Sequence, residues 1–269
     1  MNVLATLALL WALLLGAVAQ PRPTLFLIGD STMADKPDPD RNPERGWGQM
    51  LPRFLDGGVT VRNHAVNGRS SKSFIDEGKW DAVLAQLRPG DYVLIQFGHN
   101  DYKPGDPKRH TNPYTAYRRN LERYVAETRA KGATPVLATS IVQRKFNASG
   151  VLEDTHGAYT FVARQVATET GTPFVDLQLL TEDLVAARGP EGAKALYLWV
   201  APGASAMYPQ GKEDDTHLSV AGATEVARLA ATAIARLKIP LARHIRGVEG
   251  APSQGPSAGT ASRGTGSTG

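Results

Sequence analysis

The chain has no cysteine among its 269 residues. This absence excludes disulfide bonds, catalytic thiols and zinc sites that rest on cysteine. The sequence also lacks the zinc-hydrolase motif His-Glu-x-x-His and any long run of lysine and arginine. We therefore expect no metal site, and the modest net charge of +4 gives no reason to expect a nucleic-acid partner.

Long apolar runs are missing except at the start of the chain. Leu4 to Leu15 is almost entirely apolar, and the sequence Ala-Val-Ala follows at 17–19. This pattern is typical of a secretory signal peptide and is shorter than a membrane span of roughly 20 residues. No lysine or arginine precedes the run, so an uncleaved anchor helix is the alternative. We expect residues 1–19 to be a signal peptide, and the mature protein to be secreted or periplasmic without a membrane partner.

The rest of the chain divides into a domain and a tail. Residues 20–246 are long enough for one α/β domain, and 42% of the chain is apolar. Residues 247–269 consist largely of Gly, Ser, Ala, Thr and Pro. Such a segment cannot offset its ordering entropy by burial, so we expect a disordered tail. We expect the protein to be a monomer.

Short apolar runs alternate with amphipathic segments along the domain. The runs predict strands at 24–28, 59–65, 92–96, 135–139 and 173–177, and helical spacing marks 117–128 and 226–237. This alternation is typical of an α/β fold with a mostly parallel sheet and helices on both faces. Because ligands bind at the carboxyl ends of strands in such sheets, residues that follow the strands are candidates for the chemistry.

Three of the predicted strands are followed by residues suited to ester chemistry. Ser31 follows the first strand in the sequence Gly-Asp-Ser, Gly68 follows the second, and Asn100 follows the third. A serine on a sharp turn can act as a nucleophile, while backbone N–H groups and a carboxamide can stabilise an oxyanion. The alternative for each is ordinary turn chemistry. The common motif Gly-x-Ser-x-Gly is absent from the chain.

His217 stands shortly before a helix that we expect to begin near Ser219. An aspartate could orient this histidine as a general base for serine. Asp214 would reach the ring if the chain turns, whereas Asp215 would reach it if the segment is extended, and the spacing does not decide between them. The alternative is an acidic cluster at a helix start with an exposed histidine.

Taken together, these blocks resemble the SGNH (GDSL-type) hydrolases. The resemblance is closest to the rhamnogalacturonan acetylesterase branch and runs from about residue 25 to 241. It is carried by Gly29-Asp30-Ser31, Gly46-Trp47-Gly48-Gln49, Asn67-Gly68-Arg69-Ser70, Gly98-His99-Asn100-Asp101 and Glu213-Asp214-Asp215-Thr216-His217.

The resemblance implies a role for each block. Ser31 would be the nucleophile, His217 the base and Asp214 the acid that orients it, while the backbone N–H groups of Ser31 and Gly68 and the side chain of Asn100 would form the oxyanion hole. It also implies a flavodoxin-like three-layer αβα sandwich with a five-stranded parallel sheet, and no cofactor. We expect further substrate contacts from Trp47, Arg69, His99 and His156.

The loops at 66–73, 101–112 and 141–149 favour an anionic substrate. They hold seven basic residues and two acidic ones, a surplus that suits an acetylated polyanionic polysaccharide such as pectin. We therefore expect a carbohydrate acetylesterase. The alternatives are a lipolytic or thioester-cleaving esterase and a non-catalytic sugar-binding module of the same fold.

Overall fold

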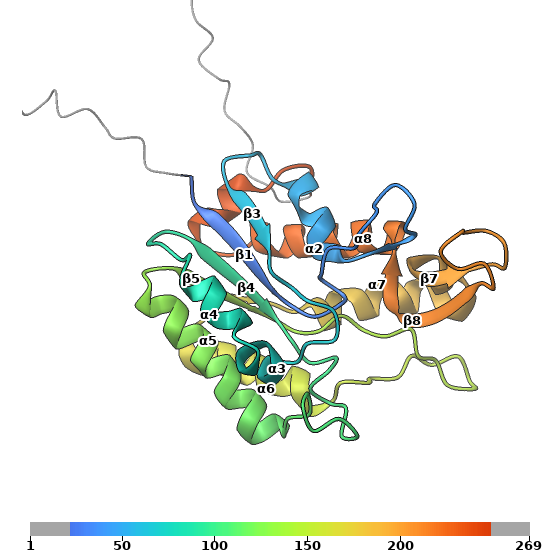
Figure 1. Ribbon diagram of the computed structural model, residues 1–269, viewed down its shortest axis with the longest axis horizontal. Coiled ribbons are helices and arrows are strands. Elements are labelled where there is room, and N and C mark those ends of the chain that lie inside the picture. Colours follow the sequence, from blue (N-terminus) through green and yellow to red (C-terminus); the bar gives the residue numbers. More distant parts are fainter. Residues whose placement is uncertain (1–21, 249–269) are drawn as a thin grey trace, which may run out of the picture.

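The computed structural model describes residues 22–248 (Figure 1). The expected signal peptide at 1–19 lies outside these residues, as does nearly all of the expected tail at 247–269, so both stay predictions. No helix within 22–248 is long and apolar enough to cross a membrane.

Five parallel strands form the main sheet, in the order β3-β1-β4-β5-β6. All five residues of β4 are buried, as expected for a strand that is covered on both faces. The prediction of an α/β fold with a five-stranded parallel sheet is confirmed. The strands are β1 (Thr24–Gly29), β3 (Thr60–Asn63), β4 (Tyr92–Gln96), β5 (Thr134–Ala138) and β6 (Phe174–Val175).

The sheet separates two hydrophobic cores, because successive side chains of a strand point to opposite faces. Leu25 and Leu27 of β1 belong to one core, and Phe26 and Ile28 belong to the other. The three layers are visible in Figure 1. The first core includes α2 (Trp47–Met50), α7 (Leu177–Gly192) and α8 (Val220–Ala235), and the second includes α3 (Ser71–Asp76), α4 (Lys79–Leu84), α5 (Arg118–Ala130) and α6 (Ala158–Thr170).

The last strand is shorter than expected. The sequence predicts a strand at 173–177, but β6 has only two residues because α7 begins at Leu177. Asp176 caps this helix by accepting a hydrogen bond from the backbone N–H of Leu179 (3.3 Å). Single helical turns complete the fold at η1 (Leu51–Phe54), η2 (Pro113–Tyr117), η3 (Ala193–Leu196) and η4 (Pro240–His244).

A second, three-stranded antiparallel sheet was not predicted from the sequence. It has the order β2-β8-β7, formed by β2 (Glu44–Arg45), β7 (Tyr197–Val200) and β8 (Lys212–Ser219). This sheet lies at one end of the molecule, where the orange segments of Figure 1 meet the start of α8. It carries the segment in which Asp214 and His217 lie.

Candidate active site

Ser31 lies in the turn directly after β1, at the carboxyl end of the main sheet. The carboxylate of Asp30 shapes this turn, since its Oδ1 accepts hydrogen bonds from the backbone N–H (2.9 Å) and the hydroxyl (2.8 Å) of Thr32. Asp30 is fully buried, and this burial raises the pKa of its carboxyl group. Unlike Asp30, Ser31 is only partly buried and lines a cavity.

A bulge in β8 brings His217 to Ser31. Leu198 of β7 pairs with Asp214, but the preceding residue, Tyr197, pairs with Leu218. Residues 215–217 are therefore extra on the β8 side and fold into a turn. As a result, His217 Nε2 lies 2.9 Å from Ser31 Oγ, although the two residues are 186 positions apart.

Asp214 holds this turn and the histidine ring together. Its Oδ1 accepts hydrogen bonds from the backbone N–H groups of Thr216 and His217 (both 2.9 Å), and its Oδ2 lies 2.9 Å from His217 Nδ1. A carboxylate can only accept, so Nδ1 carries the proton and Nε2 is left to accept one from Ser31. Burial opposes ionisation of Asp214, but the hydrogen bonds from His217 outweigh it and hold the pKa of Asp214 well below its ordinary value.

Asp215 points away from the histidine. Its Oδ1 accepts a hydrogen bond from Trp199 Nε1 (2.8 Å) and lies 2.5 Å from Arg144 Nε. The guanidinium of Arg144 also stacks over the Trp199 ring, 4.7 Å from its centre. Of the two aspartates that the sequence left open, the structure therefore places Asp214 against His217.

The expected oxyanion donors lie around the same cavity. Gly68 has a φ of +75°, a backbone conformation that favours glycine. Within residues 22–248, neither the N–H of Ser31 nor that of Gly68 donates a hydrogen bond. Asn100 Nδ2 donates to the carbonyl of Arg69 (3.1 Å), which leaves one N–H of the amide available. Arg109 donates to Asn100 Oδ1 (3.2 Å), so it fixes which end of the amide is the donor.

The cavity has a volume of about 390 Å³ and a polar lining, in which three cationic side chains face two acidic ones, Glu44 and Asp214. The sequence predicted a surplus of basic side chains in the surrounding loops, and two of these, Lys103 and Arg109, line the cavity. Lys212 of β8 adds a third cation, and Leu198 is the one aliphatic side chain in the lining. The lining consists of Ser31, Glu44, Asn67, Gly68, Asn100, Lys103, Arg109, Leu198, Tyr208, Lys212, Asp214 and His217.

Residues 27–224 match the model of the GDSL-like lipase/acylhydrolase family. The chain belongs to this family. It is an ester hydrolase, as the resemblance of its sequence blocks implied. The chain is also 43% identical to the rhamnogalacturonan acetylesterase RhgT of Bacillus subtilis, over 84% of this chain and 95% of that protein. A rhamnogalacturonan acetylesterase of Emericella nidulans is 28% identical over 80% of this chain and 85% of that protein.

Solved structures of two bacterial proteins have the same fold. The Bacillus subtilis protein YxiM is 29% identical and superposes with a TM-score of 0.70, over 81% of this chain and 58% of that one. An acetylxylan esterase of Geobacillus stearothermophilus is 22% identical with a TM-score of 0.52, over 77% of this chain and 91% of that one, which shows the fold alone.

One residue of this GDSL-like site was missed by the sequence analysis. Lys36 is buried, and its Nζ contacts the carbonyl oxygen of Ser31 (2.7 Å), Asn67 Oδ1 (2.7 Å) and Glu44 Oε1 (2.8 Å). An ammonium group has three donors, so each one has an acceptor. Lys36 therefore connects the nucleophile turn, the Gly68 loop and β2. No motif distinguishes this lysine from the exposed ones.

The expectation that Trp47 contacts the substrate is wrong. Trp47 has no exposed surface, and its Nε1 donates a hydrogen bond to Gln96 Oε1 (2.7 Å) in the core beneath α2. A fully buried indole with a satisfied N–H is a packing residue.

The histidines expected to contact the substrate are also buried. His99 and His156 are 2% and 3% exposed, and His156 Nε2 lies 2.9 Å from His99 Nδ1. Burial lowers the pKa of each to about 3, so both rings are neutral at ordinary pH. Neither lines the cavity, and their burial contradicts contact with a polymer. Arg69 is partly exposed and bound to Glu77, so its role as a substrate contact stays a prediction.

Within the part of the chain that the structure describes, no cluster of three or more histidine, aspartate or glutamate side chains is arranged to hold a metal ion.

Proposed function

We propose that the chain removes acetyl groups from rhamnogalacturonan through a serine acyl-enzyme, with Ser31, His217 and Asp214 as the catalytic triad. The observation that carries this proposal is the continuous series of contacts from Asp214 through His217 to Ser31 Oγ. This series ends in a cavity at the carboxyl end of the sheet, where substrates bind in α/β folds.

The proposed reaction has two steps. Ser31 Oγ attacks the ester carbonyl while His217 Nε2 takes its proton, and Asp214 stabilises the imidazolium that forms. The N–H groups of Ser31 and Gly68, with Nδ2 of Asn100, donate to the developing oxyanion. The sugar hydroxyl leaves with the proton from His217. Water then attacks the acetyl-enzyme in the same way and releases acetate.

Two observations support an acetylated, anionic sugar polymer as the substrate. The relatives from Bacillus subtilis and Emericella nidulans are named rhamnogalacturonan acetylesterases. The cations Lys103, Arg109 and Lys212 line the cavity and would attract the galacturonate carboxylates of such a polymer. Leu198 alone gives little apolar surface for a long acyl chain, which disfavours the lipolytic alternative.

Secretion and a monomeric state are part of the proposal. Secretion is supported by the signal-peptide pattern at 1–19. The mass of the protein recovered from the native host is expected to match a chain that starts near Gln20, whereas a mass that retains Met1 would favour an anchor helix.

A hydrolysis panel tests the substrate. We expect release of acetate from acetylated rhamnogalacturonan to exceed release from acetylated xylan, and little cleavage of long-chain acyl esters. The variant Ser31→Ala serves as the control and should lose on the order of 10⁶ in turnover while it keeps its fold. Preferential cleavage of long-chain esters would overturn the proposed substrate, and near-normal turnover in folded Ser31→Ala would overturn the mechanism.

A further inference from the structure

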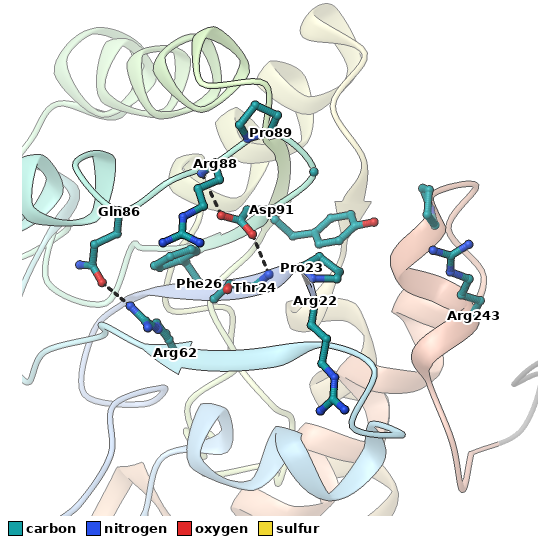
Figure 2. A pocket seen from close by; sticks show the side chains of 13 residues that line it. Arg22, Pro23, Thr24, Phe26, Arg62, Gln86, Arg88, Pro89, Asp91 and Arg243 are labelled. Carbon is teal, nitrogen blue, oxygen red and sulfur yellow. Dashed lines mark hydrogen bonds between the residues drawn. The ribbon is translucent and has the colours of Figure 1, made fainter. Parts of the chain in front are cut away.

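A second pocket lies at the opposite end of the main sheet from Ser31 (Figure 2). Its volume is about 340 Å³, and it is lined by the first residue of β1, the turn before β4, and η4. Ser31 follows the other end of β1. Because a strand rises about 3.3 Å per residue, the pocket and Ser31 are separated by on the order of 20 Å.

Four arginines from four separate segments surround this pocket. Figure 2 shows Arg62 and Arg88 near one another beside Phe26, whereas the side chain of Arg22 extends away from these two and Arg243 lies on the far side of Pro23. All four arginines are exposed. We call this group the arginine pocket.

None of the four arginines forms an ion pair with a carboxylate within residues 22–248. Arg22 donates to the carbonyl of Gly57 (3.3 Å), and Arg62 donates to Gln86 Oε1 (2.7 Å). Arg243 has one long contact, to His244 Nε2 (3.4 Å), and the guanidinium of Arg88 has no hydrogen-bond partner in the described chain. Elsewhere on the surface, by contrast, acids neutralise many arginines, among them Arg69, Arg118 and Arg164.

Asp91 is the one carboxylate in the lining, and both of its oxygens accept hydrogen bonds from backbone N–H groups. It is 5% exposed, its Oδ1 accepts from the N–H of Thr24 (2.7 Å), and its Oδ2 accepts from the N–H of Arg88 (2.9 Å). Asp91 therefore fixes the turn before β4 and leaves the four guanidinium groups without a carboxylate partner. An anion that enters the pocket would supply this partner.

We propose that the arginine pocket binds carboxylate groups of an anionic polysaccharide, and that it holds the substrate polymer at a distance from Ser31. The guanidinium fork matches a carboxylate in geometry, and arginines spread along the lining of a pocket of about 340 Å³ suit several carboxylates along a chain better than one small ion. Binding of this kind raises the local concentration of ester near the catalytic cavity. The inference rests on the proposed function for the identity of the polymer.

The test uses two matched double variants of the mature enzyme. The first variant, Arg88→Gln/Arg243→Gln, removes two positive charges from the pocket. Neither guanidinium group forms a hydrogen bond to another helix or strand of the described chain, so the fold should be unaffected. Arg119→Gln/Arg188→Gln removes two charges from exposed arginines on α5 and α7, which line neither pocket. Binding of unesterified polygalacturonate is measured by calorimetry at low and high salt, with neutral dextran and polyphosphate as further probes.

We expect the pocket variant to bind polygalacturonate roughly tenfold more weakly or worse, because it loses two charge-assisted contacts to the polymer. Binding by the wild type should also weaken with salt. On acetylated rhamnogalacturonan the pocket variant should show a raised KM and an unchanged kcat, and on a small acetate ester it should match the wild type. The control variant should resemble the wild type throughout.

The outcomes separate this inference from the proposed function. Equal binding of polygalacturonate by both variants would overturn the arginine pocket, as would binding of polyphosphate but not of polygalacturonate. If the pocket variant alone loses polygalacturonate while no variant releases acetate from rhamnogalacturonan, the carboxylate site stands and the proposed substrate fails.

Discussion

Replacing Asp214 by asparagine should nearly abolish turnover, and the structure gives the reason atom by atom. The asparagine oxygen can still accept from the N–H groups of Thr216 and His217, as Oδ1 does now. The amide NH₂ would then take the place of Oδ2, 2.9 Å from His217 Nδ1. A donor at that position forces the proton of the neutral ring onto Nε2, which can then no longer accept the proton of Ser31.

The expected loss is about 10⁴ in kcat, which corresponds to about 5 kcal/mol of barrier. Asp215→Asn is the matched control, because Asp215 is 43% exposed and contacts Arg144 and Trp199 instead of His217. The ion pair is part-buried, since the Arg144 side chain is 11% exposed, so this variant should melt earlier than the wild type and keep its turnover.

The assay is hydrolysis of a small acetate ester by both variants, with thermal unfolding measured in parallel. A folded Asp214→Asn enzyme with normal kcat would refute the proposed catalytic role of Asp214. If Asp215→Asn alone lost activity, the bulge of β8 would have to rearrange in solution so that the other acid faces the ring.

Asn100→Ala should lower kcat by roughly 10²–10³ with little change in KM, and a raised KM at constant kcat would instead make Asn100 a contact to the bound sugar. Lys36→Met should destabilise the fold by about 3 kcal/mol or more and lower kcat, because three acceptors lose their buried donor. In urea titrations the control variant Lys131→Met, at an exposed lysine, should unfold like the wild type. Equal stability of the two variants would contradict the contacts of Lys36. Trp47→Phe should lower the melting temperature through loss of the bond to Gln96 and leave KM unchanged, whereas a changed KM would restore Trp47 as a substrate contact.

The stability contributed by Asp214 should depend on pH in a defined direction. Because its folded pKa is depressed, this contribution is complete above the unfolded pKa of about 3.9 and is lost as the pH falls through the folded pKa. The difference in unfolding free energy between wild type and Asp214→Asn should therefore shrink below about pH 4. Urea titrations at pH 6 and pH 3 measure it, and a difference that grew at low pH would contradict the assigned hydrogen bonds.

The central strands β1, β4 and β5 were predictable because they are buried on both faces and are therefore almost continuously apolar, whereas the edge strand β3 is partly exposed and reads Thr-Val-Arg-Asn. The strand predicted at 92–96 has the same bounds as β4. The second sheet was not predictable in this way, because β8 begins Lys-Glu-Asp-Asp-Thr-His and has no apolar alternation. It is a strand because it pairs with β2 and β7, which are distant in the sequence.

The residue types of the candidate site could be predicted, but their surroundings could not. The choice between Asp214 and Asp215 stayed open because the sequence predicts either a turn or an extended strand, and the structure contains both, as a bulge within a strand. The sequence suggested substrate contacts at Trp47, His99 and His156 because they lie near the polar blocks or a strand end. All three side chains are buried, and burial depends on how the chain packs, which sequence position does not reveal. Lys36 carries no motif at all.

The alignment of Ser31 with His217 depends on close contact between two backbones. Glu44 and Arg45 of β2 pair with Ser219 and Leu218, directly after the histidine, so the second sheet fixes His217 relative to the segment that follows Ser31. That segment folds back on itself, since a Cβ on residue 46 would lie 2.1 Å from the carbonyl oxygen of Ala34. Only glycine permits this approach. A side chain at Gly46 would therefore push β2, and with it the base, away from the nucleophile, although residue 46 contacts no catalytic group.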